Sequence, residues 1–187
     1  MPAPSLTSLI DVVDEQNKPI GVVRRRDLFR LRANFRTVHV LIFNSRGEVL
    51  LQRLTWTKDR EPGRWGSSAA GYLHAGEDYQ DAAQRRLAEE LGLTAPLTEV
   101  GVTCLHDDAV AQFAGVFTAT ADSPRSAAPA HLAEIAFRPL AVIDDDMAAH
   151  PDDYTETLRH VLAFWRQSAR PAAFRDESLH AEPVSAT

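Results

Sequence analysis

The sequence predicts an α/β protein in which β-rich runs alternate with two amphipathic helices. Apolar runs separated by turn residues indicate two β-hairpins, within residues 9–23 and 37–53. The stretch 71–93 carries apolar residues at helical spacing, and a second apolar stripe of the same kind follows Pro151. Strands and helices are therefore both expected to contribute to the core.

Length and composition favour a single globular domain. The chain has 187 residues, of which 44% are hydrophobic and 25% are charged, enough to enclose an apolar core. We expect residues 1–168 to form this domain, with a hairpin and a short helix in residues 1–35. Residues 169–187 are polar and lack periodicity, which predicts a flexible tail.

Charge and cysteine content restrict the partners. The net charge of −6 argues against nucleic acid as a ligand, and no run approaches the roughly 20 apolar residues that cross a bilayer. The N-terminus lacks the pattern of a signal peptide, and the single Cys104 cannot form an internal disulfide. We therefore expect a cytoplasmic protein without a membrane partner, and a homodimer stays open as its assembly.

Basic residues are concentrated in the first third of the chain, between Lys18 and Arg64. A basic region facing an acidic helix suits a phosphate ligand bridged by a metal ion. A solvated arginine-rich surface explains the same pattern equally well.

The helix within residues 71–93 has clear start and stop signals. Asp78 or Asp81 begins it, and Gly92 stands where a left-handed residue would end it. Its predicted buried positions are Ala82, Ala83, Leu87 and Leu91. Its predicted outer face carries Arg85, Arg86, Glu89 and Glu90. One interpretation of that face is a pair of solvated i,i+4 ion pairs, each contributing about 0.2–0.5 kcal/mol.

The spacing of this stretch resembles the Nudix box. Its matching positions, in chain order, are Gly71, Glu77, Arg85, Glu89, Glu90, Gly92 and Leu93. One position departs, because Arg86 stands where the box has a glutamate. The resemblance implies an α/β/α Nudix sandwich with a mixed β-sheet and a MutT-like pyrophosphohydrolase that acts on acid anhydrides.

The resemblance also implies roles for these residues. Glu89, Glu90 and the carbonyl of Gly71 would hold Mg²⁺, with Mn²⁺ as the alternative ion, because hard cations prefer oxygen ligands. The metal would activate the attacking water and neutralise the leaving group. Glu77 and Arg85 would complete the catalytic set by bracing the loop against the helix.

Arg86 complicates this assignment. A cation about 6 Å from a divalent ion is repelled by roughly 5 kcal/mol at an effective dielectric constant of about 20. Either Arg86 turns to solvent or fewer metal ions bind. The general base stays unassigned, because Arg86 occupies one usual place for it.

Substrate-binding candidates lie before and just after the start of the box: Arg53, Lys58 and Tyr72. Arg53 ends a predicted strand, from which its side chain reaches either a phosphate or solvent. Trp65 and His39 are predicted as packing residues.

The segment DVVDEQNKPIGVVRRRDLF resembles the isopentenyl-diphosphate-isomerase-like branch of the family, and paired arginines in the box helix resemble that branch too. The isomerases place a catalytic cysteine and a metal-binding histidine around the box glycine, where this chain has Ala70 and Tyr72. Phe35 lies near the place of their other histidine. An isomerase is therefore disfavoured, and a catalytically weak diphosphate-binding module is a further alternative, which Arg86 supports.

The second half of the chain offers fewer signals. Asp107, Asp108 and Glu134 are candidates for a further metal ligand or base. Residues 144–146 are three aspartates, interpreted as a helix start or a solvated turn, and residues 122–130 as a mobile loop. The leading hypothesis is a Mg²⁺-dependent hydrolase that cleaves the P–O–P linkage of a nucleoside diphosphate derivative or a related small molecule.

Overall fold

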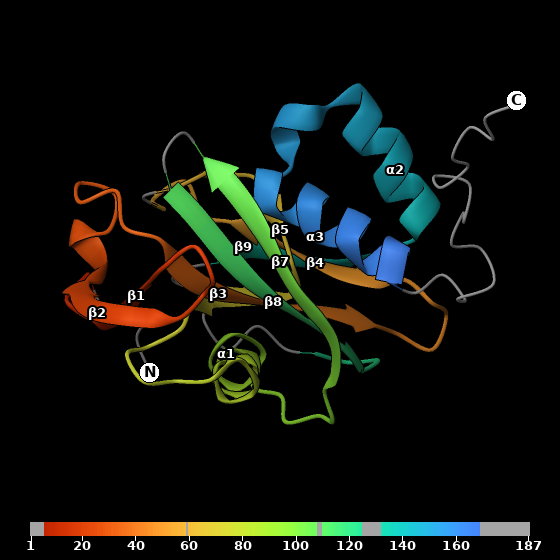
Figure 1. The fold of residues 1–187 in the computed structure, drawn as a ribbon. Helices are drawn as coiled ribbons and strands as arrows, with labels where there is room; N and C mark the ends of the chain where they lie inside the picture. Colours follow the sequence, from red (N-terminus) through yellow and green to blue (C-terminus); the bar gives the residue numbers. More distant parts are fainter. Residues whose placement is uncertain (1–5, 59, 108–109, 125–131, 169–187) are drawn as a thin grey trace, which may run out of the picture.

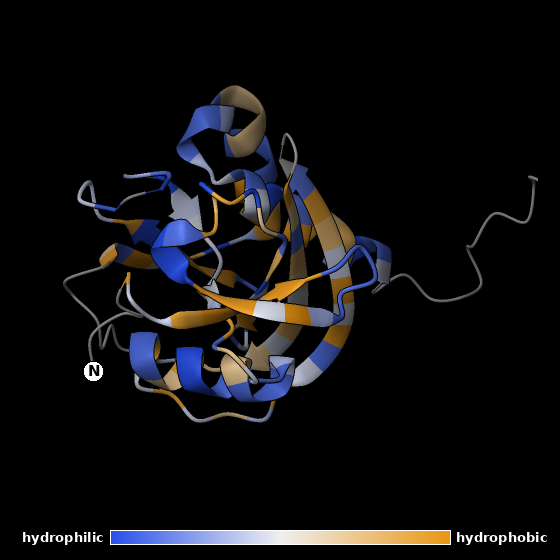
Figure 2. Cartoon of the chain, turned by 60° about the vertical axis from the view of Figure 1, so that its left-hand side comes forward, coloured by the Kyte–Doolittle hydropathy of each residue, from blue (hydrophilic) through white to orange (hydrophobic). Residues whose placement is uncertain are grey.

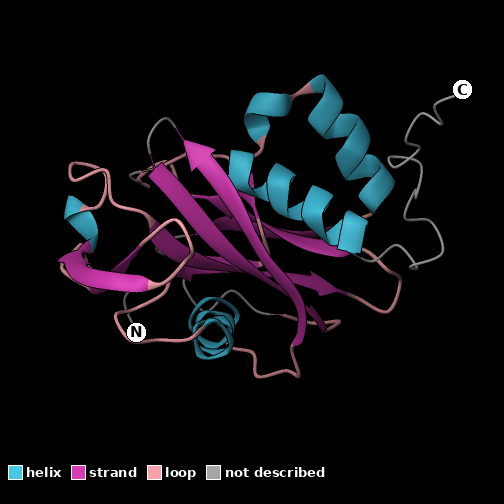
Figure 3. Ribbon diagram, viewed as in Figure 1, coloured by secondary structure: helices cyan, strands magenta, loops and turns pink. Residues whose placement is uncertain are grey.

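A mixed β-sheet lies between one helix on one face and two helices on the other (Figure 1). This arrangement is seen in a computed structural model that describes residues 6–58, 60–107, 110–124 and 132–168. Within these residues, seven strands form the large sheet and two form a separate hairpin. The predicted α/β/α sandwich is confirmed, and Figure 3 shows the same layers by type of secondary structure.

The central strand β3 (Phe35–Phe43) organises the sheet. It pairs in parallel with β8 (Val110–Thr120) along its whole length, and β8 pairs with β7 (Thr98–Asp107). On its other side, the first half of β3 pairs with β6 (Ala69–Tyr72), whereas β4 (Val49–Leu54) meets it only at Phe43. The sheet therefore splits beside β3, with β4 continuing to β5 (Trp65–Gly66) and β9 (Leu132–Arg138).

The predicted box helix is α1 (Tyr79–Leu91), and it covers one face of the sheet. The Asp78 side chain caps it by accepting a hydrogen bond from the Asp81 backbone N–H at 2.8 Å, and Gly92 ends it at a φ of 61°. All four predicted apolar positions are buried. They pack against β3 side chains of alternate positions, among them Val38, Val40 and Ile42.

The opposite face is covered by α2 (Leu140–Ala149) and α3 (Glu156–Ser168), joined by the short 3₁₀ helix η2 (Pro151–Asp153). Leu158, Val161 and Leu162 of α3 pack on Leu41 and Trp65 of the sheet, which confirms the packing role predicted for Trp65. Figure 2 shows hydrophobic residues along the strands between the helix layers. Each fully buried aliphatic side chain contributes about 1.5–3 kcal/mol.

The N-terminal hairpin of β1 (Leu9–Val13) and β2 (Pro19–Arg24) is confirmed, and the 3₁₀ helix η1 (Arg25–Asp27) follows it. It is attached to the box loop through Asp11, which is 6% exposed. The Asp11 carboxylate pairs with Arg36 of β3 and accepts a hydrogen bond at 3.0 Å from the Gly76 backbone N–H. One buried carboxylate thus links the hairpin, the sheet and the loop before α1.

Three expectations need correction or lie outside the described residues. The three aspartates 144–146 lie inside α2 and not at a helix start or in a turn. Asp144 pairs with Arg166, and Asp146 accepts a hydrogen bond from Tyr154. The tail 169–187 and most of the loop 122–130 lie outside the described residues. Within the described part of the chain, no helix is long and apolar enough to cross a membrane.

Candidate active site

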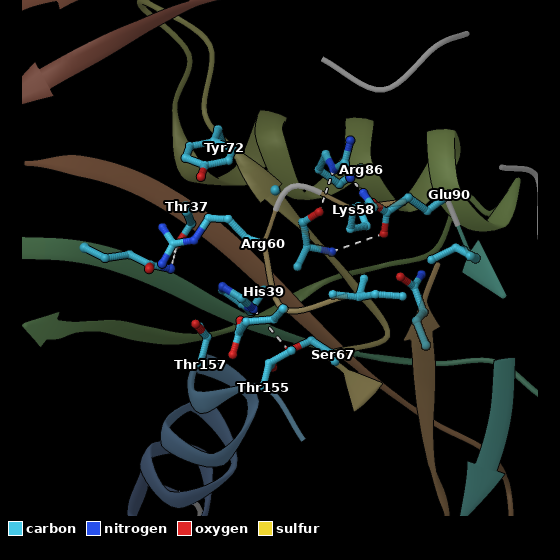
Figure 4. Close-up of a pocket in the computed structure, with 18 of the residues that line it drawn as sticks. Thr37, His39, Lys58, Arg60, Ser67, Tyr72, Arg86, Glu90, Thr155 and Thr157 are labelled. Atoms are coloured by element: carbon cyan, nitrogen blue, oxygen red, sulfur yellow. Dashed lines mark hydrogen bonds and ion pairs between the residues drawn. The ribbon is translucent and has the colours of Figure 1, made fainter. Parts of the chain in front are cut away.

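A cavity of about 190 Å³ opens where the sheet splits beside β3. Its wall comes from elements that are distant in the sequence, including β3, the loop before β5, β6, α1 and the start of α3. Figure 4 shows Arg86, Lys58 and Glu90 toward the α1 side, Thr155 and Thr157 toward α3, and His39 between them. The cavity therefore brings box residues together with residues that precede and follow the box.

Arg86 is the buried centre of the box. Its side chain is 6% exposed, and its Nε donates a hydrogen bond to the Ala70 carbonyl at 2.8 Å. One terminal nitrogen donates to Glu89 at 3.0 Å, and the other pairs with Glu90. Glu90 also accepts a hydrogen bond from the Ala70 backbone N–H at 3.2 Å. The predicted outer face is therefore wrong for Arg86 and Glu90, since β6 covers them.

The buried guanidinium explains the glycine that opens the box. A Cβ at Gly71 would lie 2.8 Å from Cζ of Arg86, closer than the two groups can approach. Arg86 therefore occupies the space that any larger residue at position 71 would need. Burial lowers the pKa of Arg86 to about 10, while Glu89 acts in the opposite direction, so the side chain is a cation at neutral pH.

The carboxylates of the box do not fit a bare divalent ion in this arrangement. Both oxygens of Glu90 are engaged, one by Arg86 and one by Ala70, and Oε2 of Glu89 accepts from both Arg85 and Arg86. Among the described residues, no group of three or more His, Cys, Asp or Glu side chains could hold a metal ion. A cation already lies between the two glutamates that the sequence assigns to Mg²⁺, and it is Arg86.

Arg85 and Glu77 form a second ion pair, with two contacts. Nε of Arg85 lies 2.7 Å from one oxygen of Glu77, and Nη2 lies 2.7 Å from the other. Arg85 also donates to the Tyr72 carbonyl at 3.1 Å, and Glu77 accepts from the His74 backbone N–H at 2.8 Å. Burial acts to raise the pKa of Glu77, but the hydrogen bonds from Arg85 and His74 outweigh it and lower the pKa. The pair ties α1 to the loop that leads into it.

Two of the three predicted substrate-binding residues line the cavity. Lys58 comes from the loop after β4, and Tyr72 ends β6 with its ring 4.9 Å from the guanidinium of Arg25. Arg53 is not among the lining residues, because its Nε donates to the Gly63 carbonyl at 3.0 Å and its guanidinium lies over Trp65. Arg53 thus supports the loop that carries Lys58.

The cavity also contains residues that the sequence did not indicate as a site. Arg25 and Arg60 add basic groups, and an uncharged set adds hydroxyl, amide and imidazole groups: Thr37, His39, Ser67, Gln112, Thr155 and Thr157. His39 was expected to pack within its strand. The alternation of β3 was the available signal, since it places Thr37 and His39 on one face, opposite Val38 and Val40.

His39 is buried as a neutral imidazole. Burial, followed by the charge of His160, lowers its pKa to about 4. Its Nδ1 lies 3.1 Å from Oγ of Ser67, whereas its Nε2 is buried with no hydrogen-bond partner among the described residues.

Of the remaining carboxylate candidates, Glu134 does not line the cavity. Glu134 is an exposed residue of β9, in register with Arg53 of β4. Asp108 and the side chain of Asp107 lie outside the described residues.

An α/β/α sandwich with a basic cavity beside a carboxylate-bearing helix suits the binding of small anionic ligands. Comparison with known proteins identifies the family. Residues 33–164 match the NUDIX domain, and the chain belongs to this family.

Similar proteins include two enzymes with different descriptions. The chain is 37% identical over 163 residues to an uncharacterized Nudix hydrolase of Pseudomonas aeruginosa, covering 86% of this chain and 96% of that one. It is 34% identical over 174 residues to an isopentenyl-diphosphate Δ-isomerase of Nocardia farcinica, covering 86% and 98%. A crystal structure from Deinococcus radiodurans shares the fold, with a TM-score of 0.74, 21% identity and coverage of 87% and 99%.

Family membership and the hydrolase relatives identify a hydrolase that acts on diphosphate-containing substrates. Nudix enzymes generally use divalent metal ions.

Substituting Gly71 with alanine should destabilise the fold by roughly 1–3 kcal/mol, because the added Cβ overlaps the Arg86 guanidinium. Chemical denaturation measures the loss. Gly21→Ala is the matched control, since a Cβ there meets nothing within 4 Å. Equal stability of the two variants would show that Arg86 is not held against position 71.

His39 should make the protein sensitive to acid. The unfolded chain binds a proton on this histidine near its ordinary pKa of 6.5, whereas the folded chain does so only near 4. The free energy of unfolding should therefore fall by about 3 kcal/mol from this group as the pH decreases from 7 to 4. His39→Asn should remove that part of the pH dependence in denaturation curves, and His106→Asn, at an exposed position of β7, should keep it.

Proposed function

We propose that this protein hydrolyses the P–O–P bridge of a nucleoside diphosphate derivative or a related small molecule, with the diphosphate bound at the α1 side of the cavity. A water oxygen forms a bond to one phosphorus, the bond from that phosphorus to the bridging oxygen breaks, and the second phosphate departs. The observation that carries this proposal is the buried Arg86, which lines the cavity from α1.

The basic side chains of the cavity support this binding mode. A guanidinium has five N–H groups, and the contacts of Arg86 with described residues engage one on each nitrogen, which leaves two for a ligand. Lys58, Arg60 and Arg25 line the same cavity. Charged hydrogen bonds from such groups to phosphate oxygens are about twice as strong as neutral ones, so this basic lining suits a diphosphate.

The metal requirement is the point on which structure and sequence differ. Mg²⁺, with Mn²⁺ as the alternative, is the ion that the sequence predicts at Glu89, Glu90 and Gly71. In the structure, the backbone carbonyl that contacts a cation belongs to Ala70, the residue before Gly71. That cation is the guanidinium of Arg86. We therefore assign phosphate neutralisation to Arg86 and assign no divalent ion to the two glutamates.

A prenyl diphosphate isomerase is the second candidate, favoured by the identity to the Nocardia farcinica enzyme. The lining residues at the places of the isomerase cysteine and histidine are Ala70 and Tyr72. A methyl group cannot transfer a proton to or from an alkene, so the hydrolase is the better supported function.

A substrate panel tests the proposal directly. Nucleoside diphosphate sugars, dinucleoside polyphosphates and both isopentenyl diphosphate isomers are incubated with Mg²⁺, with Mn²⁺ and with a chelator, and phosphate-containing products are separated. Release of products from a P–O–P bridge supports the proposal. Interconversion of the two isomers would establish the isomerase, and binding without product would establish a diphosphate-binding module.

Glu90→Gln should lower turnover by about 100-fold or more, because the loss of its charge leaves the buried Arg86 with a weaker partner and displaces it from the phosphate. Steady-state kinetics on the best panel substrate measures the effect. Glu99→Gln, at an exposed position of β7, is the matched control and should retain the wild-type rate. Wild-type turnover in Glu90→Gln would show that Glu90 has no role in catalysis.

Arg86→Glu should create a divalent-ion site. The change removes the buried cation and adds a carboxylate beside Glu89 and Glu90, so Mn²⁺ affinity without substrate should rise by about tenfold or more over the wild type. Isothermal titration calorimetry measures it, with Arg86→Gln as the control that removes the cation alone. Tight Mn²⁺ uptake by the wild-type protein would contradict the assignment of Arg86 to the cation position.

A further inference from the structure

The cavity has two chemically different ends. Its basic side chains belong to the α1 side and the adjacent loops, and among them Arg86 is paired with Glu89 and Glu90. Away from them, the wall carries uncharged polar groups on β3, the β5–β6 junction and the start of α3. It also includes apolar side chains and Glu61, whose carboxylate accepts a hydrogen bond from the Glu156 backbone N–H at 2.9 Å. A ligand that fills the cavity therefore needs a charged part and a neutral polar part.

His39 lies in the neutral part with an unused hydrogen-bonding atom. Its residue is 7% exposed, and its backbone is fixed between Ala70 of β6 and Val116 of β8. Nδ1 meets Ser67, while Nε2 has no partner among the described residues. An unsatisfied buried polar atom is costly, and a partner supplied by a ligand would remove that cost.

The neighbours of His39 explain why a charged ligand group is disfavoured there. Oγ1 of Thr37 accepts a hydrogen bond from Gln112 at 2.9 Å, and Oγ1 of Thr155 accepts one from the Leu158 backbone N–H at 3.1 Å. These contacts are all between neutral groups. The lowered pKa of His39 keeps the imidazole uncharged at neutral pH, so it offers a phosphate no compensating charge.

A hydroxyl group fits this position better than an obligate donor or an obligate acceptor. The Ser67 hydroxyl can donate to Nδ1 or accept from it, so Nε2 is a donor in one tautomer and an acceptor in the other. A ligand hydroxyl both donates and accepts, and it satisfies either tautomer.

We propose that Nε2 of His39 hydrogen-bonds a hydroxyl of the uncharged moiety of the substrate and thereby selects diphosphates of hydroxylated compounds. This inference rests on the proposed function, since it names the substrate class of the same cavity. The volume of about 190 Å³ lies below the roughly 300–1,000 Å³ of pockets that enclose drug-sized ligands. The enclosed part of the substrate is therefore the size of a single sugar or a small polyol.

Two charge-matched ligands test this role without any P–O–P cleavage. Ribose 5-phosphate and methyl phosphate carry the same phosphate, and only the first carries further hydroxyls. Calorimetry or NMR titration gives the ratio of their affinities. The wild-type protein should prefer ribose 5-phosphate by about tenfold, as expected for one added hydrogen bond to a buried group.

Two variants separate hydrogen bonding from packing. The amide nitrogen of glutamine reaches the place of histidine Nε2, whereas asparagine reaches only that of Nδ1. His39→Gln should keep most of the preference for ribose 5-phosphate, and His39→Asn should lose it while still binding methyl phosphate as the wild type does. Thermal melts confirm that both variants are folded.

The other outcomes overturn the inference. It fails if the wild type binds the two phosphates equally, if neither binds at millimolar concentration, or if His39→Asn keeps the preference. Because these ligands have no P–O–P bridge, failure here leaves the hydrolase assay unaffected, and failure of that assay leaves this binding result unaffected.

Discussion

A buried guanidinium between two carboxylates holds the box together. Arg86 contacts the carbonyl of Ala70 on β6 and the side chains of Glu89 and Glu90 on α1, at the place where the sheet splits. Removing one partner of a buried pair typically costs about 3–5 kcal/mol, because the other charge is left without compensation. The close approach of Gly71 and the orientation of Glu90 depend on this one side chain, which also contributes to the basic end of the cavity.

Local patterns predicted the regular elements well. Asp78 and Gly92 define the ends of α1 through capping chemistry, which depends only on neighbouring residues. The α/β class and the N-terminal hairpin were predictable for the same reason. The start of α3 was less accurate, since Pro151 opens a 3₁₀ turn and the helix itself begins at Glu156. The helical state of residues 144–146 was missed because its partners, such as Arg166, are distant in the sequence.

The site was predicted within the box and, outside it, at Lys58. The spacing of the box identified Glu77 and Arg85, which the structure brings together. The same spacing wrongly placed Arg86 and Glu90 on the outer face of the helix, whereas both are buried. A charged helix face is normally solvated, and only the path of β6 over the helix reverses that expectation. The alternation of β3 was the only local signal for His39, and it did not indicate a site. The position of His39 in the site comes from the split of the sheet beside β3 and from its unpaired nitrogen.

The attachment of the first hairpin bears on where the cooperative folding unit begins. The family match starts at residue 33, yet Asp11 compensates the charge of Arg36 and holds the Gly76 backbone, and Ala75 donates a hydrogen bond to the Leu9 carbonyl at 2.9 Å. Truncation at the boundary of the family match would leave a buried arginine without its anion and free the loop before α1. A shortened form of this protein for crystallography or engineering therefore has to retain the hairpin, even though the match to the family begins only at residue 33.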